Sequence, residues 1–339
     1  MRAYAPISHR ARKVRSRFKP KAWAAILSAV ALVVTGATAA IAGLPGSHHA
    51  QSTSGHHGQG PGHRPHGKVR QPASLLGASV QAGHGQTKAD AVARESHKFG
   101  HLSIVRLYYQ GPPGSWQQIH SQVGHRPVVV SFKLDPQQVV SGKFDSYMRH
   151  WFKSAPLHHR TFWSYYHEPE NNIAGHQFTA TQYRAAWAHL KRLANTAHNW
   201  HLRSTLILMC WSLNPHSGRN WHDYLATGSI NVLGWDCYNK AAHHGGYGSP
   251  QQMLGQAVRA SAGVGIPWGI GELGSKLVGH NADAGRAKWL KAVGSYVIAN
   301  HARFVTYFDS TVGGDFRLMD RPSQLAWGSA IAKSRTPRR

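Results

Sequence analysis

Three of the four glutamates in the chain fall in two short motifs, and this scarcity directs attention to them. Residues 165–170 read Tyr-Tyr-His-Glu-Pro-Glu and contain Glu168 and Glu170, whereas residues 269–274 read Gly-Ile-Gly-Glu-Leu-Gly and contain Glu272. One carboxyl group can donate a proton while a second, ionised one attacks a carbon or activates water. Because Glu170 lies beyond Pro169, we expect it to point to a loop or to solvent. The motifs therefore predict an acid–base site built on Glu168 and Glu272.

Short apolar runs alternate with amphipathic segments from Ser74 onward, and this order predicts how the glutamates are positioned. The expected strands are 75–80, 102–108, 128–134, 162–167, 205–211, 232–238, 268–272 and 304–308. The clearest expected helices are 88–99, 144–153, 181–197, 250–262 and 284–300, with a last one at 322–332. Eight such units of roughly 31 residues predict a single (β/α)8 TIM barrel, an α/β fold, over residues 72–333. A doubly wound open sheet is the alternative, but no glycine-rich phosphate loop follows the first strand.

The predicted barrel places both glutamates at its mouth, because chemistry in this fold lies at the carboxyl ends of the strands. Glu168 would close the fourth strand and Glu272 the seventh. Side chains alternate along a strand, so those in phase with a glutamate share its face. In the fourth strand these are Phe162, Ser164 and Tyr166, and in the seventh they are Trp268 and Ile270. Both glutamates are therefore expected to point into the barrel mouth.

The first 71 residues have a different composition and contain no acidic residue. Residues 1–21 are basic and residues 22–42 are apolar, ending in Ala-x-Ala patterns, so residues 1–42 are interpreted as a signal peptide. An uncleaved membrane anchor at 22–42 is the alternative. Both interpretations place the rest of the chain outside the cytoplasm, secreted or held at a membrane. Residues 43–71 are rich in Gly and His and are interpreted as a disordered linker rather than a metal-binding tract.

The formal net charge of +26 would suggest a nucleic-acid-binding protein if the basic residues were spread over the whole chain. Fifteen of them lie in the termini, four of those from Lys333 onward, and residues 334–339 form a basic tail. Residues 71–332 keep 24 basic against 13 acidic residues and show no nucleic-acid recognition motif. We therefore expect no nucleic-acid partner and a monomer, with the N-terminus able to associate with a membrane or cell wall. Cys210 and Cys237, on adjacent predicted strands, could form a disulfide or remain buried thiols.

The placement of the two glutamates on strands four and seven resembles the retaining barrel glycosidases, and glycoside hydrolase family 26 above all. The resemblance rests on His167-Glu168, on Gly271 to Gly274, on residues 211–215 (Trp-Ser-Leu-Asn-Pro) and on residues 234–238 (Gly-Trp-Asp-Cys-Tyr). It implies Glu168 as acid/base, Glu272 as nucleophile, His167 as an orienting or substrate-binding residue, and Tyr238 beside the nucleophile. It also implies a polysaccharide substrate, β-mannan first and β-glucan or xylan next, with no metal or organic cofactor.

The chain departs from that family directly after the His-Glu pair. Family members usually continue with Met-Asn-Gly, whereas Pro169, Glu170 and Asn171 follow here. This change concerns substrate specificity more than hydrolysis. A non-catalytic carbohydrate-binding or wall-binding barrel is the alternative function, and it would have the same fold without the chemistry.

Other residues are candidates for substrate contact or support. Arg106 on the second strand could hold the nucleophile ionised, or could equally be a solvated or helix-contacting arginine. Trp211, expected at the end of the fifth strand, is the best platform for a sugar ring, and Tyr109 is a weaker one. Asp309 and Asp236 are candidate polar contacts or loop caps. Three tryptophans in predicted helices are expected to be packing residues: Trp187, Trp289 and Trp327.

Overall fold

The computed structural model describes residues 73–83, 85–279 and 282–335. The expected signal or anchor segment, the linker and the last four residues of the basic tail lie outside these ranges. Among the described residues, no helix is both long and apolar enough to cross a membrane.

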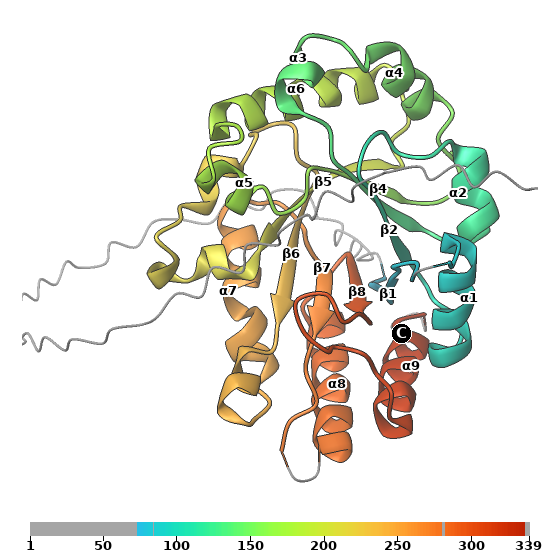
Figure 1. Ribbon diagram of the computed structural model, residues 1–339, viewed down its shortest axis with the longest axis vertical. Coiled ribbons are helices and arrows are strands. Elements are labelled where there is room, and N and C mark those ends of the chain that lie inside the picture. The colour runs from blue at the N-terminus through green and yellow to red at the C-terminus, as the bar shows by residue number, and fades with distance from the viewer. Residues whose placement is uncertain (1–72, 84, 280–281, 336–339) are drawn as a thin grey trace, which may run out of the picture. The chain divides into compact units, whose positions relative to one another are not determined.

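Eight parallel strands close into a barrel in which the strand order follows the chain order (Figure 1). The strands are β1 (Leu75–Ser79), β2 (Val105–Tyr109), β3 (Val128–Phe132), β4 (Thr161–Tyr165), β5 (Leu202–Met209), β6 (Val232–Tyr238), β7 (Trp268–Gly274) and β8 (Phe304–Phe308). Pairing of β1 with β8 completes the ring. The barrel predicted from the alternating pattern is confirmed.

Helices form the outer layer between successive strands (Figure 1). They are α1 (Lys88–Phe99), α2 (Trp116–Val123), α3 (Pro136–Val140), α4 (Asp145–Lys153), α5 (Glu170–Ala174), α6 (Ala180–Asn195), α7 (Pro250–Gly263), α8 (Ala282–Ala299) and α9 (Arg321–Arg335). The expected helices correspond to α1, α4, α6, α7, α8 and α9, whereas α2, α3 and α5 were not predicted. Each of these three is at most eight residues long, which is too short for a strong helical period.

Capping residues define where several helices begin. Reciprocal side-chain and backbone hydrogen bonds form capping boxes at Thr87, Ser115, Thr179 and Ser249. Each box satisfies two backbone N–H groups that would otherwise lack a partner at a helix start. The capping boxes therefore fix the residue at which each of these four helices begins.

The barrel interior changes from apolar to polar along its axis. Six buried side chains form an apolar plug inside the barrel, five of them near the start of their strands and Ile207 further along β5: Ile104, Val129, Phe162, Ile207, Val232 and Phe304. Further along the same strands, the buried residues become polar or charged, as Arg106, Ser131 and Asp236 show. The remaining core lies between the strands and the helices and contains the buried Trp187, Trp289 and Trp327, as predicted. The carboxyl ends of the strands are thus the end at which charged side chains meet.

Candidate active site

Glu168 does not lie on a strand, because β4 ends three residues earlier at Tyr165. Tyr166 and Glu168 both adopt positive φ, 45° and 50°, in the left-handed region that is costly for residues other than glycine. Two hydrogen bonds to neighbouring strands hold the segment: the Tyr166 N–H donates to the Phe132 carbonyl at 2.7 Å, and the Glu168 N–H donates to the Ile207 carbonyl at 2.9 Å. The expected strand 162–167 was too long, and this anchored turn, rather than strand alternation, directs Glu168.

Glu272 lies on β7, but the phase assigned to it from the sequence was wrong. Trp268 and Ile270 belong to the outer core, so simple alternation would turn Glu272 outward as well. Ile270 pairs with Trp235 while Glu272 pairs with the next residue, Asp236, so β7 contains one extra residue, a β-bulge. The bulge resets the alternation and brings Glu272 to the inside.

Gly271 is the extra residue, and the surrounding side chains leave room only for glycine. A Cβ atom at this position would collide with Oδ1 of Asp236 and Nη1 of Arg106. The bulge and the neighbouring ion pair therefore occupy the same space and depend on each other.

Three donors surround the Glu272 carboxylate. The Tyr108 hydroxyl donates to Oε1 at 2.7 Å, and the Tyr238 hydroxyl donates to Oε2. The guanidinium Nη1 of Arg106 lies 3.4 Å from Oε1. Charge-assisted hydrogen bonds of this kind stabilise a carboxylate anion and fix its orientation. Arg106 is fully buried, so the alternative of a solvated arginine is excluded.

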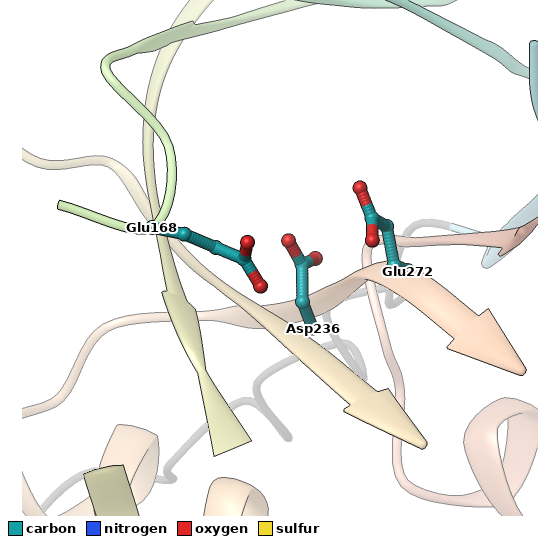
Figure 2. Close-up of side chains that lie close together, drawn as sticks. All are labelled: Glu168, Asp236 and Glu272. Carbon is teal, nitrogen blue, oxygen red and sulfur yellow. The ribbon is translucent and has the colours of Figure 1, made fainter. Parts of the chain in front are cut away.

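Asp236 on β6 completes a cluster of three carboxylates. Its Oδ1 is 3.1 Å from Nη1 of Arg106, and both side chains are fully buried. One oxygen from each of Glu168, Asp236 and Glu272 lies within 4.8 Å of the others. Figure 2 shows the three side chains converging from β6, β7 and the turn after β4. Burial raises the pKa of Asp236 well above its ordinary value, and the charges of Glu272 and Glu168 add to this, although Arg106 opposes it.

Glu168 has different surroundings from Glu272. Burial, followed by the negative charges of Glu272 and Glu170, raises the pKa of Glu168 to about 8. Arg106 and Lys133 lower this pKa but do not outweigh the other causes. Near neutral pH, Glu168 therefore retains its proton, whereas the Glu272 carboxyl group accepts hydrogen bonds from Tyr108 and Tyr238. This is the division of roles that acid–base catalysis by two carboxyl groups requires.

His167 and Lys133 border the cluster. His167 is buried with its ring edge-on to Tyr108, 5.5 Å between ring centroids, and burial lowers its pKa well below the usual value. A neutral imidazole in this position can donate or accept a hydrogen bond without adding charge. Lys133 follows β3 directly, and its Nζ lies 5.0 Å from the centre of the Tyr166 ring.

Two acidic residues considered in the sequence are engaged in the protein itself. Glu170, expected to reach a loop or solvent, is fully buried at the start of α5. Its Oε1 accepts hydrogen bonds from the Met209 N–H at 2.7 Å and from the Ser212 hydroxyl at 3.0 Å, because the chain turns sharply after β5 and leaves these donors unpaired. Asp309 accepts a hydrogen bond from the Leu318 N–H at 2.6 Å and pairs with Lys98.

The aromatic candidates occupy two positions around the mouth. The fifth strand was expected to reach Trp211, but β5 ends at Met209 and Trp211 lies in η1 (Cys210–Leu213), a 3₁₀ turn. Its ring is 38% exposed, with Nζ of Lys240 at 4.1 Å from the ring centre. Tyr109 is half-buried at the end of β2, where Nζ of Lys88 lies 4.1 Å from its ring centre. Trp211 is thus the more accessible flat surface of the two.

Cys210 and Cys237 form a disulfide, one of the two alternatives that the sequence left open. Cys210 begins η1 and Cys237 lies on β6, between Asp236 and Tyr238. The bond therefore ties the turn that carries Trp211 to the strand that carries Asp236, one of the three carboxylates, and Tyr238, a donor to Glu272.

The three carboxylates also form the one group with metal-ligand spacing among the described residues. Carboxylate oxygens suit hard divalent cations. Arg106, however, already supplies a positive charge in contact with Asp236 and beside Glu272, at 3.1 and 3.4 Å. This donor set fits a protein cation better than an added metal ion.

The sequence interpretation missed two residues of the site and undervalued a third. Tyr108 and Lys133 were not singled out, and Asp236 was considered only as a polar contact or cap. Tyr108 shares the phase of Arg106 on the same strand, and Lys133 follows the end of a predicted strand. Both signals are in the sequence, but tyrosines and lysines are common at strand ends and do not identify a site by type.

No family model matches the chain, and no curated protein matches it in sequence. Solved structures do match the fold. A broad-specificity GH5-4 endoglucanase from Clostridium longisporum is 11% identical with a TM-score of 0.55, covering 79% of this chain and 98% of that one. A glucosidase from Croceicoccus marinus is 13% identical with a TM-score of 0.54, covering 80% and 69%. The GH26 domain of a Prevotella bryantii endo-β-mannanase/endo-β-glucanase is 11% identical with a TM-score of 0.51, covering 76% and 88%. At this identity the likeness concerns the fold alone, and it includes a GH5 as well as a GH26 structure, so it does not single out family 26. The chain has a barrel of the kind found in glycoside hydrolases.

Proposed function

We propose that the protein is a retaining β-glycan hydrolase in which Glu168 is the acid/base and Glu272 the nucleophile. The observation that supports this most directly is the pairing of two unlike carboxyl groups at the barrel mouth, with oxygens within 4.8 Å of each other. Retaining glycosidases hold their two carboxyl groups about 5–5.5 Å apart, and inverting ones about 6.5–9.5 Å apart. The fold shared with endoglucanases and an endo-β-mannanase is consistent with a glycan substrate.

The proposed reaction has two steps. First, Glu168 donates its proton to the glycosidic oxygen as that bond breaks, and a carboxylate oxygen of Glu272 bonds to the anomeric carbon. Then the ionised Glu168 removes a proton from water, the water oxygen bonds to the anomeric carbon, and Glu272 leaves as a carboxylate. Tyr108, Tyr238 and Arg106 hold the attacking oxygens in place.

The remaining residues of the mouth are assigned to substrate. Trp211 provides an exposed flat ring for the apolar face of a sugar, and His167 and Tyr109 contact sugar hydroxyls. β-Mannan is the first candidate because of the resemblance to the mannanase-like family. β-Glucan and xylan come next, because the residues after His167-Glu168 differ from those of that family. The protein is proposed to act outside the cytoplasm on a polysaccharide, as a monomer.

Two variants test the assignment. Glu272→Gln should lower kcat on the polysaccharide about 10³-fold or more, because the covalent step is lost. Glu168→Gln should lower it about 10²–10⁴-fold on the polysaccharide but far less on an aryl glycoside whose leaving group needs no proton. Release of reducing ends from mannan, glucan and xylan, together with aryl glycoside turnover, measures both.

Glu95→Gln is the matched control, since Glu95 is the one glutamate of the chain outside the two motifs and lies on α1, beside Arg94. It should keep full activity. Unchanged turnover in both mouth variants would sink the assignment. Binding of a polysaccharide by the unaltered protein with no product from any of the three would favour the non-catalytic barrel instead.

A further inference from the structure

Six segments lead from an α-helix into the next strand; none contains an acidic residue, and five of them contain His or Arg. They are residues 100–104, 124–127, 154–160, 196–201, 264–267 and 300–303, all at the end of the barrel where the strands begin. All 13 acidic residues lie between Asp90 and Asp320, within the described part of the chain, yet none lies in these segments. The arginines at this end of the barrel therefore have no acidic neighbour within these segments.

Three arginines gather beneath the apolar plug at this end. Arg160 directly precedes β4, Arg303 directly precedes β8, and Arg203 on β5 pairs in register with Phe162. Phe162 and Phe304 touch across the barrel, with ring centroids 4.8 Å apart, and so bring the starts of β4 and β8 together. The three arginines line one hollow of about 240 Å³.

No ion pair or side-chain hydrogen bond engages these three guanidinium groups within the described residues. Burial, and then the charge of Arg203, lowers the pKa of Arg160. Burial, and then the charges of Arg160 and Arg203, lowers the pKa of Arg303. Gathering like charges in a half-buried place costs free energy, and an oxyanion would offset this cost through charge-assisted, bidentate hydrogen bonds.

Trp200 stands at the rim of the same hollow. Its ring is 70% exposed and rests against the His201 ring, 3.6 Å between ring centroids. Two adjoining hollows, of about 340 and 360 Å³, also border on both Trp200 and Arg203. An exposed indole beside a cationic hollow can contact the apolar face of a sugar while the arginines receive an acidic group.

We propose that this end of the barrel is a second, non-catalytic binding site for an acidic carbohydrate, with Arg160, Arg203 and Arg303 receiving its carboxylate or phosphate and Trp200 receiving its ring. The choice of carbohydrate rests on the proposed function. A single exposed indole and a compact charge cluster favour one sugar unit over a nucleic-acid strand, which is bound by successive stacked bases along an extended groove.

Calorimetric titration of the full-length chain tests the site with four probes: trigalacturonate, mannose 6-phosphate, neutral mannotriose and oligothymidylate. Trigalacturonate or mannose 6-phosphate should bind, the tighter one identifying carboxylate or phosphate as the natural group, and mannotriose should not. Arg203→Gln and Trp200→Ala should each weaken binding about tenfold or more, through loss of a charge-assisted hydrogen bond or of the ring contact. Trp200 is exposed, so its replacement leaves the fold intact and separates lost binding from lost folding.

Arg259→Gln, which removes the same charge from the exposed surface of α7, is the matched control and should bind like the unaltered protein. Because every variant contains the same basic N-terminal segment, that segment contributes equally to all. Equal weakening in the control, or no weakening in the two variants, would overturn the proposal. Tighter binding of oligothymidylate that depends on the same two residues would overturn it in favour of nucleic acid. Glu272→Gln should still bind the acidic probe, so failure of hydrolysis and failure of this site are distinguishable.

Discussion

Where the strands end, Arg106 lies between Asp236 and Glu272, whereas where they begin, Arg160, Arg203 and Arg303 lie beside one another. The first arrangement is neutralised by the protein itself and is held rigid by hydrogen bonds. The second has no acidic partner among the described side chains and faces a hollow. In our proposals the same side chain thus serves in two ways, to preorganise reacting groups at one end and to attract a charge from outside at the other.

The largest expected difference between the two ends appears when one arginine at each end is replaced by leucine. Arg106→Leu leaves buried carboxylates without their cation and should lower the free energy of unfolding by about 3–5 kcal/mol. Arg203→Leu removes a like-charge repulsion and should change it by less than about 1 kcal/mol, in either direction. Denaturant unfolding of both variants measures the difference. A similar loss of unfolding free energy in both variants would show that the two groups of arginines do not differ in this way.

The disulfide is the next largest effect, and it lies near the end of the barrel where the strands end. It closes a loop with a sequence separation of 27. Loop-closure entropy then predicts that replacing Cys210 and Cys237 by alanine lowers the free energy of unfolding by about 3–4 kcal/mol. Reducing agent should produce a similar loss in the unaltered protein and none in the double variant. A reductant that leaves the unaltered protein unchanged would refute this prediction.

The smallest effect concerns pH. Glu168 must be protonated to act as an acid, so kcat should fall as pH rises through its pKa of about 8. Lys133 lowers this pKa, and Lys133→Gln should therefore move the alkaline limb of the kcat profile to higher pH, by less than about one unit. Lys143→Gln, an exposed lysine between α3 and α4, should leave the limb in place. A shift to lower pH with Lys133→Gln would contradict the charge relation.

The fold could be predicted from the sequence because each β-α unit repeats the same local signal. For β6 and β8 the expected bounds agree with the structure at both ends. Strand ends near the mouth were harder, because the chain leaves extended geometry there: Tyr166 and Glu168 adopt positive φ, and η1 begins directly after Met209. Such turns depend on neighbours in space, which the local pattern does not contain.

The sequence predicted that Glu168 and Glu272 lie together at the barrel mouth, but not what orients their side chains. Their strand numbers put both at the mouth, yet the inward turn of Glu272 depends on the bulge at Gly271. The central position of Asp236 depends on Arg106, 130 residues away in the chain. The arginines at the other end were missed for a similar reason, since Arg160, Arg203 and Arg303 come together only when the ring closes.

Gly271 has a consequence for how this protein could be redesigned. Because a side chain there would displace both Asp236 and Arg106, β7 and the ion pair must be changed together or not at all. Trp211, by contrast, lies on a turn outside the barrel wall and is attached to it through Cys210. If Trp211 contacts substrate as proposed, exchanging the η1 segment should alter substrate preference, whereas Gly271 can be replaced only together with the Arg106–Asp236 pair.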